Sequence, residues 1–439
     1  MKRKLLFILM VFAAISTAIA GRTEIKFTEY TLDNGLHVIL HEDNSAPIVA
    51  IGVTYHVGSK NEQPDRTGFA HYMEHLMFEG SKNIARGDFF KLAQDAGGNI
   101  NAYTSHDKTF YFVMLPSNQL EMGLWMESER LLHLVIDEEG VETQRSVIKE
   151  ERSQMYDNRP YGSIMEETFS RAFKEHPYNW LPIGSVQYID EATIDEFREF
   201  HSTYYVPNNA VLSIAGDIDI EETKKLIELY FADIPKGTKP IYRPEVVEAP
   251  LDGEIRDTIM EPETPMPAII QAYRIPGKTH DDFYALDMLT TLLSTGESSR
   301  LHRSVVNQQQ KALMIQSVPF KLEDPGLFLV LGIANMGIDP GELEKAIDAE
   351  IEKVRREGLT DTEYKKLRNN KESSAISNFA SLFQLVDNLA DYHVFHGDAN
   401  LINTEIDKYM SVTKEDIIRV ANKYLVPENR VVLYYLPQN

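Results

Sequence analysis

Five consecutive residues, His71-Tyr72-Met73-Glu74-His75, combine two imidazoles and a carboxylate at a spacing that suits metal chemistry. Positions four apart on a helix share one face, so His71 and His75 can bind one Zn²⁺ at roughly 2.0–2.1 Å. Glu74 points into the same space, where a carboxylate beside a zinc-bound water is the general base of a metal hydrolase. The order is the inverted H-x-x-E-H form of a metallopeptidase signature. A helix with two ordinary histidines and an exposed glutamate is the alternative.

A catalytic zinc site needs a third protein ligand, and the helix predicted over residues 142–157 offers one. The apolar face of this helix is indicated by Val141, Val147, Ile148 and Met155. Glu151 is expected in the middle of that face, whereas Glu150 is expected to face solvent. A carboxylate on a buried face is costly unless it is paired, and a metal ion is such a partner. A salt bridge from Glu151 to a nearby Lys or Arg is the alternative.

An internal repeat indicates that the elements around these residues belong to one of two similar domains. At one constant offset, 193–211 matches 413–431, and both copies read as a helix, a Tyr-x-Val-Pro-x-Asn turn and an apolar strand. The same offset places His71–His75 on Thr291–Thr295, which contains no metal ligand. Because only one copy carries the motif, the repeat favours a chemical role for the histidines over a packing role.

Each half mixes strands and helices without strict alternation, which favours the α+β class. In the first half, strands are predicted at 27–32, 36–41, 48–55 and 109–115, and helices at 67–79, 89–96, 120–134 and 142–157. Asp33-Asn34-Gly35 is a hairpin turn signal, and seven prolines between 235 and 267 indicate a stiff linker. The predicted organisation is a signal peptide at 1–20, a metal-bearing domain at 21–240, a linker at 241–262 and a homologous domain without metal at 263–439.

The N-terminal residues predict an exported protein. Lys2-Arg3-Lys4 is followed by an apolar stretch over 5–14 and by Ala18-Ile19-Ala20, a small-residue cleavage site. Cleavage after Ala20 would release the chain to the periplasm or the medium, and an uncleaved membrane anchor is the alternative. No later stretch is apolar and long enough to predict a membrane span.

Composition restricts the ligands and the partners. The sequence contains no cysteine, so a metal site must be built from His, Asp or Glu. The chain carries 67 acidic and 44 basic residues, a formal net charge of −23 that argues against nucleic-acid binding.

Longer segments around the motif resemble the pitrilysin–insulysin–mitochondrial processing peptidase family of zinc metallopeptidases, in a short two-domain bacterial form. The segments are His71–His75, Gly97–Thr104, Arg145–Glu151, Tyr156–Gly162, His176–Tyr178, Ile183-Gly184, Tyr205–Asn209 and Gly216-Asp217. The resemblance implies that His71, His75 and Glu151 hold one Zn²⁺ per chain and that Glu74 is the general base. It also implies two similar α+β domains that form half of a clamshell, in which short or unfolded peptides bind as an added β-strand.

Other residues match the family in part. Asn101, Ala102 and Tyr103 match its substrate-binding edge strand, for which an ordinary turn and strand is the alternative. Gln144 stands where many relatives have a glutamate that supports the zinc site, although Gln can still hydrogen-bond a ligand.

One substrate-binding residue of the family, a tyrosine, is missing from this chain, and its absence bears on how the chain assembles. Arg300 matches an arginine that helps to bind substrate, but the tyrosine that accompanies it is replaced, as we read the motifs, by Ile315. We therefore expect a heterodimer with an inactive sister chain that supplies the tyrosine, with a homodimer as the alternative.

The sequence thus predicts an exported zinc endopeptidase. Two rival functions stay open: an accessory or scaffold subunit without activity, and a zinc-bearing module that captures peptides without cleaving them. Accessory subunits of this family usually lose part of the zinc motif, which this chain keeps whole.

Overall fold

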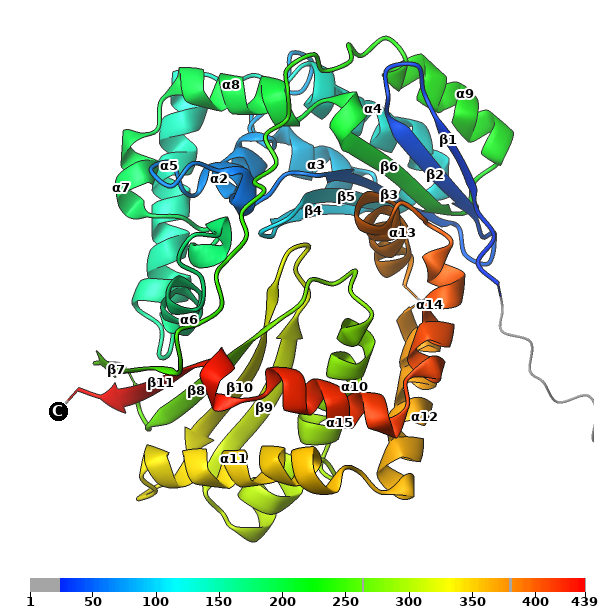
Figure 1. Cartoon of the computed structure of the whole chain (residues 1–439). Coiled ribbons are helices and arrows are strands. Elements are labelled where there is room, and N and C mark those ends of the chain that lie inside the picture. Colours follow the sequence, from blue (N-terminus) through cyan, green and yellow to red (C-terminus); the bar gives the residue numbers. More distant parts are fainter. Residues whose placement is uncertain (1–23, 263, 379–380, 439) are drawn as a thin grey trace, which may run out of the picture.

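The computed structural model describes residues 24–262, 264–378 and 381–438, which form two halves of the same α+β design (Figure 1). The predicted signal peptide at 1–20 lies outside the described residues. Among the helices in these ranges, none combines the length and the apolar composition needed to cross a membrane.

The first half contains a six-stranded sheet with the order β1-β2-β6-β3-β5-β4. Its strands are β1 (Thr28–Thr31), β2 (His37–Glu42), β3 (Ile48–Tyr55), β4 (Asn99–Thr104), β5 (Thr109–Pro116) and β6 (Ala210–Gly216). Strands β2 and β6 run parallel, and the other neighbours are antiparallel. β4 pairs only with β5 among the described strands, so its outer edge is available for another strand.

The first half contains eight α-helices among the described residues. They are α2 (Phe69–Leu76), α3 (Asp88–Asp95), α4 (Leu120–Leu132), α5 (Glu138–Arg152), α6 (Ile164–Ala172), α7 (Val186–Glu191), α8 (Ile194–Tyr204) and α9 (Ile220–Phe231). Of these, α2, α3, α4, α5 and α8 lie close to the predicted positions. Helix α5 begins earlier than predicted, at Glu138, because Asp137 caps it, accepting a hydrogen bond from the Gly140 amide at 2.9 Å. After Arg152 it continues as a π-helical segment, Ser153–Asp157.

The second half repeats five of these six strands, all except β1. Its order, β7-β11-β8-β10-β9, corresponds to β2-β6-β3-β5-β4, again with one parallel pair, β7 and β11. The strands are β7 (Ile255–Glu261), β8 (Ala268–Ile275), β9 (Ala312–Phe320), β10 (Gly326–Ala334) and β11 (Arg430–Pro437). Residues 255–261, which the sequence places in the linker, therefore form a strand of the second sheet, whereas 241–254 contain no helix or strand.

The helices of the second half follow the same repeat. They are α10 (Asp282–Ser294), α11 (Pro340–Glu357), α12 (Asp361–Asn378), α13 (Leu382–His396), α14 (Leu401–Ser411) and α15 (Lys414–Tyr424). Helices α8 and α15 begin and end at equivalent positions of the repeat, and each begins with a capping box, Thr193 with Glu196 and Thr413 with Asp416. The predicted duplication is thus a structural one.

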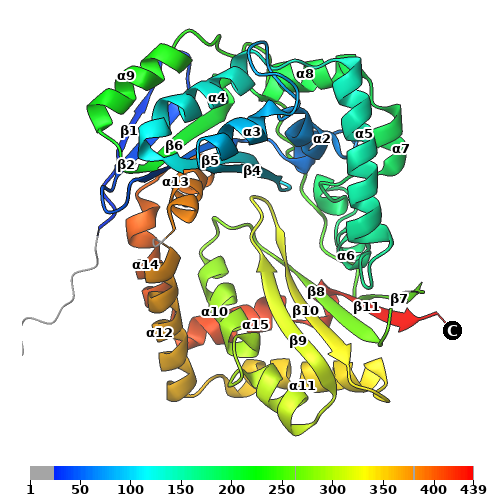
Figure 2. The same cartoon turned by 180° about the vertical axis from the view of Figure 1, so that it is seen from behind.

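The two halves exchange one helix each. Helix α13 of the second half packs on strands β3 and β6 of the first sheet, and helix α6 of the first half packs on β8 and β11 of the second. The α13 contact is a buried apolar cluster of Ile39, Ala50, Phe110, Val211, Ala215, Leu385, Val386, Leu389 and Ala390. Figures 1 and 2 show both helices against the sheet of the other half. Each sheet therefore depends on both halves for burial of its apolar surface.

Candidate metal centre

Helix α2, which carries the motif, is fixed at its N-terminus by close backbone packing. Gly68 has φ +98°, and a side chain at Gly184 would meet the Gly68 Cα at 2.3 Å, so both positions require glycine. The buried Glu62 carboxylate accepts hydrogen bonds from the Gly68 and Ala70 amides at 2.9 and 2.7 Å. Although these bonds oppose it, burial raises the pKa of Glu62 to about 8. Glu62 satisfies amides that the start of a helix leaves unpaired.

The structure brings His71, His75 and Glu151 together. The two imidazole Nε2 atoms lie 3.3 Å apart, and the Glu151 Oε2 atom lies 3.3 Å from His75 Nε2 and 3.6 Å from His71 Nε2. The hydrogen bond from the Tyr72 hydroxyl to the Val141 carbonyl, at 2.6 Å, joins α2 to α5 and holds the two helices in register. Glu151 is half-exposed, whereas His71 is buried.

These distances fit a zinc ion. Ligand atoms at 2.0–2.1 Å from a tetrahedral centre are separated by about 3.3–3.4 Å, close to the three separations between the His71, His75 and Glu151 atoms. Two imidazoles and one carboxylate are also a ligand set of hydrolytic zinc sites, which leave the fourth position open. The donor set therefore suits catalytic zinc.

The protonation states of His71 and Glu151 agree with this assignment. Burial alone would lower the pKa of His75, but the hydrogen bond with Glu151 and the nearby carboxylates outweigh it and raise that pKa. Burial, together with the neighbouring His75, lowers the pKa of His71 to about 4, so its imidazole is neutral at pH 7. The hydrogen bond with His75 lowers the pKa of Glu151, and the carboxylate is ionised. A neutral imidazole and an ionised carboxylate are the forms that bind metal.

Glu74 connects the motif to the edge strand. Its Oε2 atom accepts a hydrogen bond from the Thr104 hydroxyl at 2.6 Å, and Thr104 is the last residue of β4. Burial raises the pKa of Glu74, which brings a carboxylate closer to the proton affinity that a general base needs. Asn101, Ala102 and Tyr103 lie on the same strand, so the motif and the predicted substrate-binding residues are neighbours.

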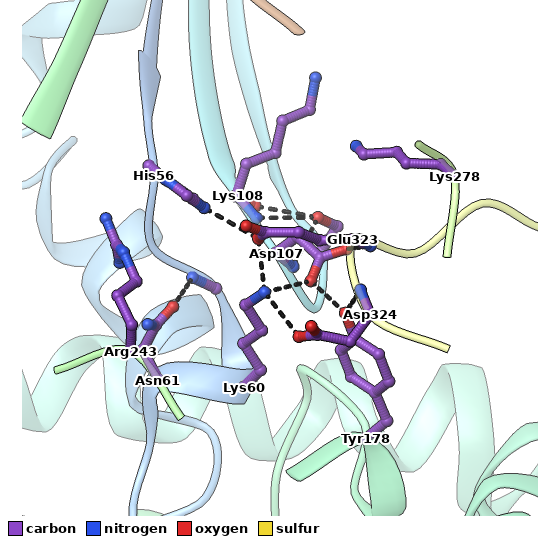
Figure 3. A network of polar contacts seen from close by, with 12 residues as sticks. His56, Lys60, Asn61, Asp107, Lys108, Tyr178, Arg243, Lys278, Glu323 and Asp324 are labelled. Carbon is purple, nitrogen blue, oxygen red and sulfur yellow. Dashed lines mark hydrogen bonds and ion pairs between the residues drawn. The ribbon is translucent and has the colours of Figure 1, made fainter. Parts of the chain in front are cut away.

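The turn after β4 is anchored by the second half (Figure 3). The Asp107 carboxylate accepts hydrogen bonds from the Tyr178 hydroxyl at 2.5 Å and from the Glu323 amide at 2.9 Å. The buried Lys60 ammonium contacts Asp107 at 3.2 Å, Asp324 at 3.0 Å and the Glu323 carboxylate. We refer to this group of residues, at the contact between the β4–β5 and β9–β10 turns, as the charge clasp.

Helix α13 also contributes to the position of β4. The Tyr103 hydroxyl donates to Asp387 Oδ2 at 2.8 Å, and the Lys108 ammonium lies 2.5 Å from Asp387 and 2.6 Å from Asp391. The strand next to the motif is therefore held by residues distant in the sequence.

The reason given above for Glu151 is wrong, although the residue is where it was expected. Val147 and Met155 are 44% and 50% exposed, so they do not mark the buried side of α5. The buried side runs through Val141 and Ile148, at helical spacing, and continues to Glu151. Glu150 is exposed, as predicted.

The structure does not bring Arg300 into contact with the motif residues. Its guanidinium is buried in the second half, where Nε and Nη2 donate to the two Glu363 oxygens at 2.9 Å each and Nη2 donates to the Gly358 carbonyl at 2.7 Å. Ile315 is 5% exposed and belongs to the core of the second half. Because that position faces the core, it would not present a tyrosine hydroxyl to a peptide.

Sequence reasoning missed Glu62 and Thr104. Thr104 ends the quoted segment Gly97–Thr104, and a hydroxyl next to a predicted substrate strand was a usable signal. Glu62 accepts hydrogen bonds from the Gly68 and Ala70 amides at the start of α2, and no sequence pattern used above predicts this contact.

A second cluster of possible ligands, Glu29, His37 and His393, has a different geometry. The His37 and His393 rings stack with centroids 3.5 Å apart and planes 9° apart. Nitrogen lone pairs lie in the ring plane, so two parallel stacked rings cannot both direct them at one ion. This cluster does not have the arrangement of a metal site.

Comparisons with known proteins identify the family of the chain. Residues 37–180 match the family described as insulinase (peptidase family M16), and 191–371 match the peptidase M16 inactive domain. The chain is 31% identical over 414 residues to the zinc protease PqqE of Helicobacter pylori, covering 94% of this chain and 93% of that one.

Solved structures show the same architecture. A protease from Helicobacter pylori superimposes with a TM-score of 0.91 at 31% identity, covering 94% of this chain and 100% of that chain. The periplasmic protease PqqL from Escherichia coli superimposes with a TM-score of 0.78 at 20% identity, but the match covers 94% of this chain and only 48% of that one. With a zinc-type donor set in the first half, none at its repeat in the second, and this similarity over nearly its whole length, the chain belongs to peptidase family M16.

Proposed function

We propose that this chain is an exported zinc-dependent endopeptidase that holds one Zn²⁺ between His71, His75 and Glu151. The observation that carries the proposal is the convergence of the three ligand atoms at 3.3, 3.3 and 3.6 Å, contributed by two helices that the Tyr72–Val141 hydrogen bond ties together. The family, and relatives named as zinc proteases, support the same chemistry.

In this proposal the residues of the chain divide the reaction between them. When bound, Zn²⁺ polarises the scissile carbonyl and lowers the pKa of the attacking water. Glu74 accepts the proton of that water and then delivers it to the leaving amine, and Thr104 holds the carboxylate in place by its hydrogen bond.

The substrate of this proposal is an extended peptide added to the free edge of β4. Asn101, Ala102 and Tyr103 would offer backbone groups on that edge, which suits recognition of unfolded segments with little sequence preference. The adjacency of β4 and Glu74, through Thr104, supports this placement because it brings a bound strand next to the proton acceptor.

We further propose that two chains complete the chamber. The chain matches 48% of the Escherichia coli protein PqqL, so its fold corresponds to about half of that chain. The preferred assembly is a heterodimer with an inactive sister chain that supplies the tyrosine, because the buried Ile315 of this chain offers no hydroxyl, and a homodimer is the alternative. Heterodimer and homodimer are therefore distinguished by the mass of the native complex from its source.

The decisive test replaces Glu74 by Gln. The variant should retain one zinc per chain and lose cleavage of a mixed peptide pool, because only the proton acceptor is removed. Glu150→Gln, on the exposed side of α5, is the matched control and should cleave like the wild type. A chelator should stop wild-type cleavage, and addition of Zn²⁺ should restore it.

Two results would reject the proposal. Substantial hydrolysis by Glu74→Gln would remove Glu74 from the mechanism. A wild-type chain that binds zinc and peptides but releases no products would identify the chain as a capture module or an accessory subunit.

A further inference from the structure

One of the two proposed histidine ligands is oriented by a hydrogen-bonded partner. His75 Nδ1 lies 3.0 Å from the side-chain oxygen of Gln144 on α5. His71 Nδ1 is buried without a hydrogen-bond partner among the described residues. Of the two rings, His75 is therefore the one whose Nδ1 is held by a hydrogen bond among the described residues.

A glutamine alone cannot determine which ring nitrogen of a histidine carries the proton. Its amide has an oxygen that accepts and a nitrogen that donates, and the two ends are nearly the same size. If the nitrogen faced His75, Nδ1 would have to accept, and the proton would sit on Nε2. The Nε2 lone pair that points at His71 and Glu151 would then be lost.

Glu79 determines which end of the amide faces His75. The side-chain nitrogen of Gln144 donates to Glu79 Oε1, and a carboxylate can only accept. The amide oxygen is therefore turned toward His75, whose Nδ1 must donate. Glu79 is only 8% exposed, so water does not compete freely for its oxygens.

Glu79 is itself held in place. Its second oxygen pairs with Arg86 Nη1, and Arg86 Nη2 binds both oxygens of Asp137 at 2.7 and 2.9 Å. Asp137 caps α5, the helix that also carries Gln144 and Glu151. The chain of contacts from Asp137 to His75 thus starts and ends on the two helices that supply the proposed ligands.

We propose that Glu79 is a positioning residue that, through Gln144, fixes the proton of His75 on Nδ1 and leaves Nε2 free to bind zinc. The inference rests on the proposed zinc site and adds to it the source of the ligand orientation. Glu79 does not contact His75 in this arrangement. It acts through Gln144, which is hydrogen-bonded to both residues.

The test exchanges the two side chains. Glu79→Gln leaves two amides that can pair in either direction, and the dissociation constant for Zn²⁺ should rise roughly tenfold, the lower end of the effect of removing an outer partner. Gln144→Glu sets two carboxylates against each other and should also weaken binding. The double variant Glu79→Gln/Gln144→Glu restores one carboxylate and one amide, and its affinity should return to within about threefold of wild type.

Zinc affinity is measured on the full chain by competition with a chelator of known affinity, and the melting temperature is followed in parallel. Arg86→Gln is the matched control, because it removes the Glu79 salt bridge but leaves the acceptor for Gln144, and its zinc affinity should change less than that of Glu79→Gln.

Unchanged zinc affinity in Glu79→Gln, or a double variant as weak as the product of the single ones, overturns the inference and leaves the proposed function intact. A wild-type chain without zinc affinity overturns both. Recovery of zinc affinity in the double variant at an unchanged melting temperature assigns the effect to the hydrogen bond and not to overall stability.

Discussion

The two halves place the same pair of helices side by side, α2 with α5 and α10 with α12, but join them with different chemistry. In the first half His71, His75 and Glu151 converge between the helices. In the second half Lys371, which occupies the position of Glu151 in the repeat, pairs with Asp287 at 2.7 Å. The fold therefore accommodates a polar link between these helices, and the residue types decide whether the link is a metal site or a salt bridge.

The contact from helix to edge strand is repeated too. Glu74 accepts from Thr104 on β4, and Ser294, the repeat counterpart of Glu74, lies 2.8 Å from the hydroxyl of Ser317 on β9. A hydroxyl pair can hold the helix to the strand but does not supply a base near neutral pH. The comparison shows that the scaffold positions both contacts and that, of these two places, the first has a carboxylate where the second has a hydroxyl.

The largest effect is expected when the first half is given the residue of the second. Glu151→Lys places a cation beside the two histidines, so zinc binding should fall by more than the roughly 10–100-fold that loss of an outer partner causes, and cleavage should fall to background. Metal analysis of the purified chain measures the loss of zinc. Glu150→Lys, one residue away and exposed, should keep its zinc. A full equivalent of zinc in Glu151→Lys would show that Glu151 is not a ligand.

The corresponding change in the second half is Lys371→Met, which should lower the stability of the fold and leave the zinc content unchanged. Asp287 loses its ammonium partner in a buried place, and we expect unfolding in urea to require about 3 kcal/mol less. Lys365→Met, at an exposed position of the same helix, is the control. Loss of zinc in Lys371→Met would contradict the independence of the two sites.

A smaller effect is expected at the contact with the edge strand. Thr104→Val removes the hydroxyl that holds Glu74, and kcat should fall about tenfold with unchanged zinc content, since a hydrogen bond to a charged group contributes about 1.5–3 kcal/mol. Thr104→Ser keeps the hydroxyl and should retain most of the activity. Ser317→Ala makes the matching change in the second half, and an equal loss of kcat there would contradict the division of roles.

The smallest effect concerns the charge clasp, which joins the halves. Burial alone would raise the pKa of Glu323 and Asp324, but hydrogen bonds from His56 and His176 and the charge of Lys60 outweigh it and lower both to about 2. Carboxylates with a lowered pKa stabilise the fold above about pH 4, and this contribution is lost as the pH falls toward 2.

The double variant Glu323→Gln/Asp324→Asn isolates the contribution of the charge clasp to the pH dependence of stability. Stability of the wild type should fall more steeply than that of the double variant between about pH 5 and pH 2, as followed by urea unfolding. Parallel curves for the two proteins would mean that the clasp does not contribute to acid sensitivity.

Features that depend on residues close together in the sequence are predicted better than contacts between residues far apart. The strand at 48–55, the hairpin and the internal repeat are confirmed, because local periodicity and turn residues determine them. The place of the histidine pair follows from spacing on one helix. Glu151 is predicted as the third ligand from a wrong choice of the buried face of α5. Val147 and Met155, which indicate that face in the sequence, are apolar but exposed.

Contacts between distant segments were outside the reach of sequence patterns. Nothing in the residues around Glu79 or Thr104 indicates that they will contact Gln144 and Glu74. The strand β7 inside the predicted linker, and the exchange of α6 and α13, are likewise decided by packing between the halves. The roles of Asn101, Ala102, Tyr103 and Arg300 toward a peptide stay predictions.

The exchange of α6 and α13 has a mechanical consequence. If the backbone were cut within 241–254, neither fragment would be a finished domain, because each would carry the helix that shields the other's sheet. The fragments should therefore migrate together after a nick and aggregate when produced apart. For the same reason, moving the halves apart would expose apolar surface on both sheets.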